Sequence, residues 1–354
     1  GRGRAARLLG RELARRGVRV TAITPRQHGQ REVEQMDGIT VLGYRPDRPW
    51  HAAALCRDCD ADVYHSHDPS LATALAAFAL PARAHVVTVR ALHTARTRLA
   101  TLRAPPYGRL RAVARWAEEA NPLVWLAVHR AHATFCAAHD LIPLVRAKYR
   151  LAEASFLPTA VEVPRRVQKG RTPMVCFLGG WERPCRPEAF IALAARFPRV
   201  TFVGVGRSMD RAYDAHLRRA LAPLANVRLL GFVNPFRSEA LSQVLSESWI
   251  LLSASAHLGL PDAWLEGGAH RCAILSATDC DGFAARFGVH AADGDLAAGL
   301  DALLAGDAWR ERGLRGYEHV RDTFELSRAV AQHVDAYQRA MQLPDSVSPA
   351  KFPS

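Results

Sequence analysis

The sequence predicts an α/β protein with two doubly wound domains that face each other across a cleft. The chain has 354 residues, of which 49% are hydrophobic, and this is more than one ordinary core contains. Apolar runs typical of strands alternate with segments of helical periodicity along most of its length. The stretch 157–173 is rich in Pro, Arg and Lys and lacks periodicity, so we interpret it as the linker between the domains.

The first domain opens with the glycine-containing segment "GRGRAARLLGRELARRG". Ala5, Leu9 and Leu13 repeat at helical spacing, Gly17 ends the helix, and "VRVTAIT" then alternates like a strand. A strand precedes such a loop in a doubly wound domain. We therefore expect the first strand of the N-terminal domain to be missing, and the initial Gly1 to mark a fragment or a processed form.

Further strands are expected at residues 39–44, 61–67 and 84–90 and at "ATFCAA", with helices at "HAAALCRDC" and "SLATALAAFAL". The run 84–90 is almost continuously apolar, which is typical of a strand buried on both faces. Because strands and helices alternate, the sheet should be parallel with helices on both faces.

A basic insertion between the strand at 84–90 and "ATFCAA" interrupts this order. Two interpretations stay open: a basic, aromatic face that lies on an anionic membrane, or a helical pair that packs on the domain with its basic face in solvent. The residues that suggest the membrane are Arg96, Arg98, Arg103, Arg109, Arg111, Arg115, Trp116 and Trp125.

After the linker the alternation restarts, and it predicts a second doubly wound domain. Its expected strands are "MVCFLGG", "VTFVGVG", "VRLLGFV", "WILLSAS" and "CAILSA", with helices between them and three helical stretches after them. The expected organisation is an N-terminal domain at 1–165, a C-terminal domain at 166–325, a helix at 326–342 that packs back on the N-terminal domain, and a disordered tail at 343–354.

The net charge of +13 favours anionic partners such as phosphorylated substrates, anionic lipid or nucleic acid. The sequence contains no apolar run of about 18 residues, so no spanning helix is expected. The scattered cysteines lack the spacing of a zinc site and fit free thiols in the cytoplasm. These features predict a cytoplasmic protein that could also associate with the inner face of a membrane.

Glycines recur where the predicted strands end. Glycine lets a backbone approach a phosphate closely, and the N-terminus of a helix attracts anions. Their shared position in the second domain indicates a nucleotide site, although a tight strand-to-helix turn also requires glycine. These residues are Gly1 and Gly3 in the first domain, and Gly179, Gly180, Gly204, Gly206 and Gly231 in the second.

These segments together resemble the retaining glycosyltransferases of family 4, which have the GT-B fold. The resemblance extends from Gly1 to about Gln342 and is most specific between Val175 and Gly282. It rests on "GRGRAARLLGRELARRGVRVTAITP", "DVYHSHDP", "HVVTVR", "FLGGWERPCRPEAF", "VTFVGVG", "VRLLGFV" and "GLPDAWLEGGAHRCAILSA".

The resemblance implies a nucleotide-sugar donor in the C-terminal domain and an acceptor in the N-terminal domain. Glu266 matches the second acid of a Glu-seven-residues-Glu motif that holds the donor ribose, and Val233 matches a backbone position that meets the base. Gly259, Leu260 and Pro261 match the turn between the two acids, at the phosphate or sugar. Gly1 and Gly3 match a loop near the donor phosphate. The resemblance also implies that the enzyme needs no cofactor or bound metal, because basic side chains and amides stabilise the leaving diphosphate.

Four motifs depart from the family pattern. Leu258, with His257 beside it, replaces the first acid. Gly180 and Cys185 stand at the family's basic pair, and we expect Arg183 and Arg186 to substitute for it. Arg90 replaces the family's histidine at a strand end, with His93 three residues on, and we take these two as candidate catalytic residues. "LPTAV" replaces "LPNGV" before the linker.

The expected function is the transfer of a sugar to a glycan, lipid or small-molecule acceptor, in polysaccharide biosynthesis. Three alternatives stay open: a degenerate homologue that binds only nucleotide or partners, a nucleotide-sugar epimerase, and a basic binding protein. Nucleic acid is not expected as a partner, because no RNA-binding signature or helix-turn-helix spacing occurs. His65 and His67 are either acceptor contacts or residues of a strand end, and His257 either fills the space of the missing acid or faces solvent.

Overall fold

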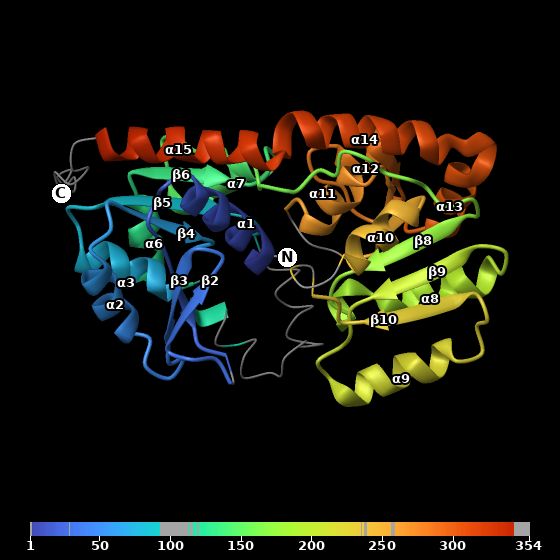
Figure 1. Ribbon diagram of the computed structural model, residues 1–354, viewed down its shortest axis with the longest axis horizontal. Coiled ribbons are helices and arrows are strands. Elements are labelled where there is room, and N and C mark those ends of the chain that lie inside the picture. The colour runs from blue at the N-terminus through green and yellow to red at the C-terminus, as the bar shows by residue number, and fades with distance from the viewer. Residues whose placement is uncertain are drawn as a thin grey trace. The chain divides into compact units, whose positions relative to one another are not determined.

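Parallel sheets flanked by helices organise the chain in two units (Figure 1). The computed structural model describes residues 2–27, 29–92, 113, 116–118, 120–234, 236, 239–255 and 259–342. The N-terminal unit is built from described residues within Arg2–Leu92, Ala114–Ala160 and Leu326 onward, and the C-terminal unit mainly from those within Val161–Glu325.

Strands of the N-terminal unit fall into two hydrogen-bonded groups, ordered β1-β3-β2 and β4-β5-β6-β7. Every residue of β5 is buried, which confirms the prediction of a strand covered on both faces. All pairs are parallel except β2 with β3. The strands are β1 (Val20–Pro25), β2 (Val33–Met36), β3 (Ile39–Tyr44), β4 (Val63–His67), β5 (Ala84–Val89), β6 (Ala133–Cys136) and β7 (Ser155–Phe156).

The helices of this unit bury apolar faces against the sheet and one another. The last one, α15 (Leu326–Gln342, red in Figure 1), packs Val330 on Leu9 and Leu13 of α1, and Ala336 and Ala340 on the β4-β5-β6-β7 sheet. The other helices are α1 (Arg2–Arg15), α2 (His51–Cys59), α3 (Leu71–Ala79), α6 (Pro122–His129) and α7 (Leu141–Tyr149).

A single six-stranded parallel sheet forms the centre of the C-terminal unit, in the order β10-β9-β8-β11-β12-β13. Doubly wound sheets of this kind are the fold class that the sequence predicts. The strands are β8 (Met174–Leu178), β9 (Thr201–Val205), β10 (Val227–Gly231), β11 (Ile250–Ser253), β12 (Ala273–Ser276) and β13 (Gly288–His290).

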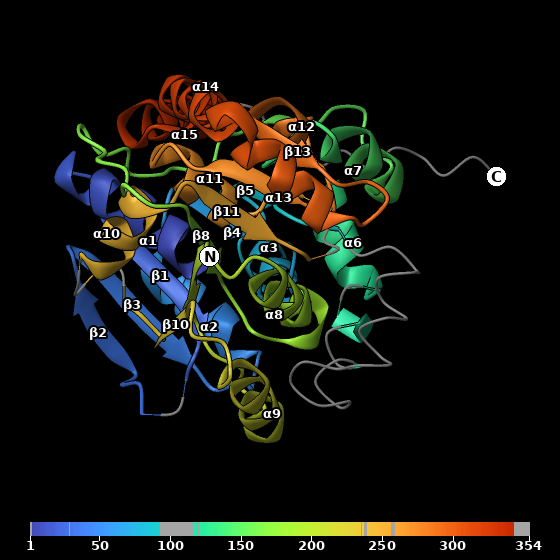
Figure 2. The ribbon, with the colours of Figure 1, turned by 90° about the vertical axis from the view of Figure 1, so that its right-hand side faces the viewer.

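Helices cover both faces of this sheet (Figure 2). Val175 and Phe177 of β8 share one core with α8, α9 and α13, whereas Leu251 and Ile274 meet Gly267 of α11 on the other face. The helices are η1 (Arg183–Cys185), α8 (Pro187–Arg196), α9 (Arg211–Leu221), α10 (Ala240–Glu247), α11 (Asp262–Ala269), α12 (Phe283–Phe287), α13 (Leu296–Leu304), η2 (Ala305–Asp307) and α14 (Ala308–Phe324).

Two local features differ from the sequence prediction. β2 and β3 form an antiparallel hairpin through Asp37 and Gly38, both at positive φ, which was not expected. The start of the expected linker is buried rather than exposed, since Leu157 is in the core of the N-terminal unit and Val161 bridges Glu325 in the C-terminal unit. Within the described ranges, no helix has both the length and the apolar character needed to cross a membrane.

Candidate functional site

The predicted donor-site residues follow the parallel strands of the C-terminal unit. Gly179 and Gly180 come directly after β8, Val233 lies two residues after β10, and Gly259 and Leu260 lie between β11 and α11. The carboxyl ends of parallel strands meet at one edge of a sheet, where ligands of open α/β sheets bind. The structure therefore brings these residues to one edge.

Two of the glycines at this edge are required by packing. A Cβ on Gly206 would lie 2.0 Å from the carbonyl oxygen of Gly179, and a Cβ on Gly204 would lie 2.3 Å from the Trp181 ring. Trp181 is buried and donates its indole N–H to the carbonyl of Val205 at 3.4 Å. Gly204 in β9 thus makes room for Trp181, and Gly206 directly after β9 makes room for the Gly179 carbonyl, so neither glycine carries a separate signal of a phosphate.

Gly179 and Gly180 differ from those glycines because the space around them is open. No atom lies within 4 Å of a Cβ added to Gly179, which has a φ of +137°, and the nearest atom to one on Gly180 is 3.8 Å away. Their backbone is consequently accessible at the strand end, as contact with a ligand phosphate requires.

Glu182 joins the segment after β8 to the segment after β9, and sequence reasoning missed it. Its side chain is 6% exposed and accepts hydrogen bonds from Ser208 Oγ at 3.0 Å and from the Met209 N–H at 2.7 Å. These bonds fix the strand-end loops on either side of Trp181. Its place between a tryptophan and an Arg-Pro pair gives no local signal of this role.

Arg183 and Arg186 lie where the chain enters α8. The Arg183 guanidinium carbon lies 4.2 Å from the ring centroid of Tyr213 on α9. Arg186 is exposed and takes a φ of +52° immediately before Pro187, the first residue of α8. The two cations are therefore near a helix N-terminus, which also attracts anions. Cys185 is half-buried, and burial raises the pKa of its thiol.

Glu266 is buried in α11, with 7% of its surface exposed. The carbonyl of Glu266 accepts a hydrogen bond at 2.7 Å from Nδ1 of His270, whose Nε2 is 2.8 Å from Ser242 Oγ. Gly259, at a φ of +126°, and the buried Leu260 precede this helix. His257 and Leu258 lie outside the described residues.

Two exposed apolar side chains at the same strand ends were not predicted. Phe232 is 70% exposed just after β10, and Met209 is 62% exposed in the segment after β9. The two segments are joined where the Gly206 N–H bonds the Gly231 carbonyl at 2.7 Å. Exposed aromatic rings provide surface on which a flat base can stack.

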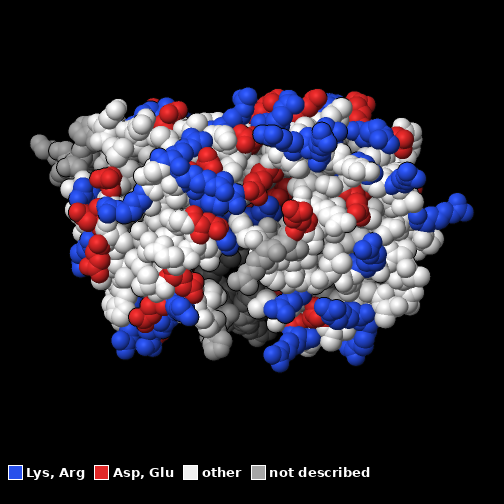
Figure 3. All heavy atoms as spheres, viewed as in Figure 1, with Lys and Arg blue, Asp and Glu red and all other residues white. Residues whose placement is uncertain are grey.

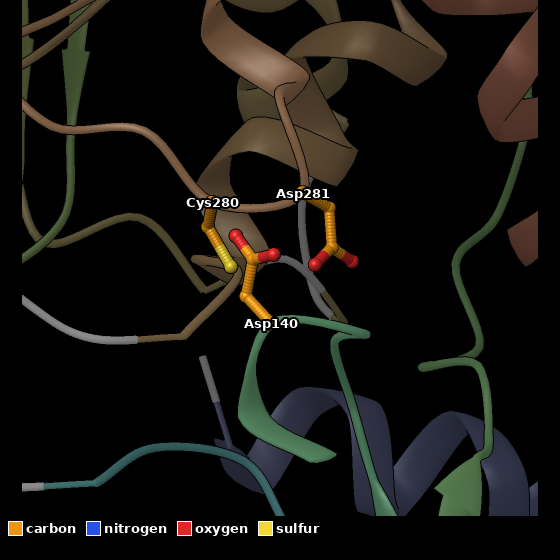
Figure 4. Close-up of side chains that lie close together, drawn as sticks. All are labelled: Asp140, Cys280 and Asp281. Carbon is orange, nitrogen blue, oxygen red and sulfur yellow. The ribbon is translucent and has the colours of Figure 1, made fainter. Parts of the chain in front are cut away.

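The turn between β12 and α12 has a defined conformation of its own. Asp279 Oδ1 accepts hydrogen bonds from the N–H groups of Cys280 at 2.9 Å and Ala284 at 2.8 Å, and Asp281 and Gly282 have positive φ. Figure 4 shows the Cys280 and Asp281 side chains on this turn. This conformation accounts for the Asp-Gly pair of "TDCDGF".

The N-terminal unit contains the other predicted residues. Gly3 lies in the first turn of α1 rather than in a loop before it. Arg90 follows β5, is 8% exposed, and donates its backbone N–H to Asp68 Oδ1 at 2.7 Å. His67 ends β4 beside His65, with ring centroids 4.2 Å apart. Gly1 and His93 lie outside the described residues.

Arginines from 96 to 115 in the basic insertion also lie outside the described residues, so the structure decides neither interpretation of it. Trp116 is exposed, whereas Trp125 on α6 stacks on His129 and donates its indole N–H to the carbonyl of Lys148 at 2.9 Å. Trp125 thus has a packing role. In Figure 3 basic side chains gather over α1, and basic and acidic side chains mix along α14.

Comparisons with known proteins agree with this architecture. The model of the family described as Glycosyltransferase Family 4 matches residues 1–165. A search of curated proteins found no match. Among solved structures, the chain is similar to sucrose-phosphate synthase from Thermosynechococcus elongatus, with 16% identity, a TM-score of 0.73, and 96% of this chain and 93% of that chain covered.

Two further structures match over nearly the same length. Anabaena HepE in complex with UDP and glucose is 12% identical, with a TM-score of 0.68 and 96% of each chain covered. A glycosyltransferase from Rickettsia africae is 13% identical, with a TM-score of 0.66 and 96% of this chain and 94% of that chain covered. The chain therefore has the GT-B fold, and the match to the model of Glycosyltransferase Family 4 extends over residues 1–165.

Proposed function

We propose that the protein is a glycosyltransferase that moves a hexosyl group from a nucleotide-sugar to an acceptor. The observation that carries this proposal is the set of groups at one edge of the C-terminal sheet. This edge carries three kinds of group: open backbone at Gly179 and Gly180, arginines at the start of α8, and the buried acid Glu266. They are the groups that a diphosphate and a ribose diol require.

Within this site each group has a proposed role. Glu266 accepts hydrogen bonds from the ribose hydroxyls, and the base lies at Val233 beside the exposed ring of Phe232. Arg183 and Arg186 stabilise the diphosphate, together with the amides near Gly180, without a bound metal. Because HepE was solved with UDP and glucose, uridine diphosphate is the first nucleotide to test.

The N-terminal unit binds the acceptor in this proposal, and the reaction retains the configuration of the sugar. The acceptor is a glycan, a lipid-linked sugar or a small molecule. If the basic insertion lies on a membrane, the protein should sediment with vesicles that contain anionic lipid and should be released by high salt. Retention in the supernatant at low salt would contradict the membrane location.

A degenerate homologue that binds nucleotide without transfer is the second candidate. It is favoured by Cys185, which stands where family members have a basic residue, and by the stacking of Arg183 on Tyr213. Calorimetric titration with UDP, GDP and ADP, followed by turnover of the matching nucleotide-sugars, separates the two. Nucleotide binding with turnover supports the transferase, binding without turnover supports the degenerate homologue, and no binding contradicts both.

A further inference from the structure

An exposed methionine lies on a tightly bonded backbone at the strand ends of the C-terminal unit. Met209 is 62% exposed in the segment that joins β9 to α9. In the sheet β9 lies between β8 and β10, and the arrowheads of these three strands end on one side of the unit (Figure 1). Met209 therefore follows the middle strand. The turn at Gly179, where we place the diphosphate, follows one neighbouring strand, and the exposed Phe232 follows the other.

Glu182 fixes the backbone at Met209. Its buried carboxylate accepts the Met209 N–H at 2.7 Å through Oε1 and the Ser208 hydroxyl at 3.0 Å through Oε2. Ser208 Oγ in turn accepts the N–H of Asp210 at 3.2 Å, and the carboxylate of Asp214 accepts the Ser208 N–H at 3.2 Å. Two carboxylates, one from the segment after β8 and one from α9, therefore hold the backbone that carries the exposed methionine.

The segment is also secured at both of its ends. Asp210 Oδ1 accepts the N–H groups of Ala212 at 3.0 Å and Tyr213 at 3.1 Å, and so caps the N-terminus of α9. At the other end, the Gly206 N–H bonds the Gly231 carbonyl at 2.7 Å, which joins the segment to the end of β10. A ligand that contacts Met209 therefore has to order one side chain and not a loop, which lowers the cost of binding.

Met209 and Phe232 offer two kinds of apolar surface at this edge. A thioether is polarisable and makes favourable contacts with aromatic rings, and a phenyl ring stacks on flat bases. Both side chains are largely exposed to water in the free protein. A flat, uncharged ring gains free energy by covering such surface, whereas a charged diphosphate does not. The base is the part of a nucleotide that has this form.

We propose that Met209 contacts the nucleobase of the donor, and that Glu182 is the residue that positions it there. The assignment rests on the proposed function, because it takes the donor to be a nucleotide-sugar. It adds a side chain after β9 to the base site, beside Phe232 after β10. It also gives Glu182 a part in nucleotide binding, although this carboxylate itself does not touch the ligand.

The sequence contains four methionines, so their methyl signals can be followed one by one. We suggest NMR of protein labelled with carbon-13 at the methionine methyl groups, titrated with UDP, GDP and ADP and, as a ligand without a base, with pyrophosphate. The tightest-binding nucleoside diphosphate should shift the Met209 signal in a saturable manner. It should also give a nuclear Overhauser effect between the Met209 methyl protons and the protons of the base. Pyrophosphate should leave the Met209 signal in place, and the signals of Met36 on β2 and Met341 on α15 should not respond to either ligand.

The outcomes separate this inference from the proposed function. If a nucleoside diphosphate binds in calorimetric titration while the Met209 signal stays in place, or responds equally to pyrophosphate, the base lies elsewhere. The inference is then overturned and the nucleotide site remains. If none of the three nucleoside diphosphates binds, the proposed function and the inference both fail.

A variant of Met209 with a matched control measures the contact. Met209→Ala should weaken binding of the nucleoside diphosphate about three- to tenfold and leave pyrophosphate binding unchanged. Met341→Ala, which truncates a methionine that is 50% exposed on α15, should change neither affinity. Equal affinities of the Met209→Ala and Met341→Ala proteins for the nucleotide would contradict the contact.

Variants of Glu182 test its positioning role. Glu182→Ala should weaken nucleotide binding by a factor similar to that of Met209→Ala, and the double variant should be little weaker than either, because both changes remove one arrangement. Glu182→Gln keeps an oxygen that accepts the Met209 N–H, so it should retain wild-type affinity. Additive losses in the double variant, or a Glu182→Gln protein as weak as Glu182→Ala, would overturn this role. If Glu182→Ala does not fold, the affinity of Glu182→Gln and the Met209 signal of the wild type still decide.

Discussion

The guanidinium of Arg183 lies over the ring of Tyr213, with 4.2 Å from the guanidinium carbon to the ring centroid. The Tyr213 hydroxyl donates in turn to Glu188, in the first turn of α8. One predicted phosphate ligand is thus attached by stacking to a residue thirty positions later in the chain. The stack holds the arginine near the N-terminus of α8, where we place the diphosphate.

The first prediction concerns this arginine. Arg183→Gln should weaken UDP binding by about tenfold or more, because a charge-assisted hydrogen bond contributes about 1.5–3 kcal/mol. Uridine, which lacks the diphosphate, should bind the variant and the wild type equally. Calorimetric titration of both ligands measures the difference.

Arg218→Gln is the matched control for this experiment. Arg218 is exposed on α9 and pairs with Asp214 at 2.7 Å, so its loss changes the net charge equally without touching the entry to α8. If Arg183→Gln and Arg218→Gln weaken UDP binding to the same small extent, Arg183 does not contact the phosphates and acts only through its stack on Tyr213.

The second prediction concerns the buried acid of α11. Glu266→Gln keeps the size of the side chain but removes the carboxylate that we place on the ribose diol, so UDP and uridine should both lose about ten- to a hundredfold in affinity. Glu311→Gln, an exposed change on α14 of the same unit, should have no effect. Unchanged affinity in a folded Glu266→Gln protein would remove Glu266 from the site.

The third prediction separates packing glycines from ligand glycines. A Cβ at Gly206 would overlap the Gly179 carbonyl, and φ there is +124°, so Gly206→Ala should lower the free energy of unfolding by about 3 kcal/mol. Gly180→Ala meets no atom closer than 3.8 Å and should change it by less than about 0.5 kcal/mol. Denaturant titration measures both values.

Nucleotide affinity completes that comparison. If the backbone at Gly180 approaches the diphosphate, Gly180→Ala should weaken UDP binding while the protein remains as stable as the wild type. A Gly180→Ala protein with wild-type affinity for UDP would show that the phosphates do not approach this turn. The stable variant is therefore the informative one, since Gly206→Ala loses stability for a reason unrelated to ligand.

Local patterns predicted the elements of this fold, whereas contacts between distant residues determined what the site residues do. The apolar run at 84–90 is the buried β5, and "PEAFIALAARF" contains α8, because periodicity depends only on neighbouring residues. By contrast, Gly204 makes room for Trp181, Gly206 makes room for the Gly179 carbonyl, and Arg183 stacks on Tyr213, through contacts that no spacing reveals. Asp37-Gly38 was a local hairpin signal that the prediction overlooked.

The burial of Leu157, at the start of the expected linker, likewise depends on a contact with a distant part of the sequence. "LPTAVEVPRRVQKGRTP" has the composition of an exposed connection, yet Leu157 packs with Val86 and Ala336 in the core of the N-terminal unit. Leu157 is covered by α15, which is more than 160 residues away in the sequence. The residues next to Leu157 therefore give no sign that it is buried. Tertiary packing therefore overrode composition at this position.

The fourth prediction is that stability falls as the pH is lowered from 8 to 5. Burial lowers the pKa of His65, His67 and His333 in the folded protein, the last two to about 3 and about 4. The unfolded chain titrates near 6.5, so below that pH it binds more protons than the folded protein does. Stability is thus fully present above about pH 6.5 and is lost progressively as the pH falls toward the folded values.

His333→Gln should make this dependence shallower, because one of the three buried imidazoles that resist protonation is removed. The groups that face the cluster are Arg90, whose charge opposes protonation, and Tyr337 and Thr88, which bond His65. His51→Gln, an exposed change on α2, should follow the wild type at every pH. Melting temperatures at half-unit steps of pH measure the three slopes. If wild type and His333→Gln have parallel slopes between pH 8 and 5, protonation of His333 does not contribute, and the acid sensitivity of the fold arises elsewhere.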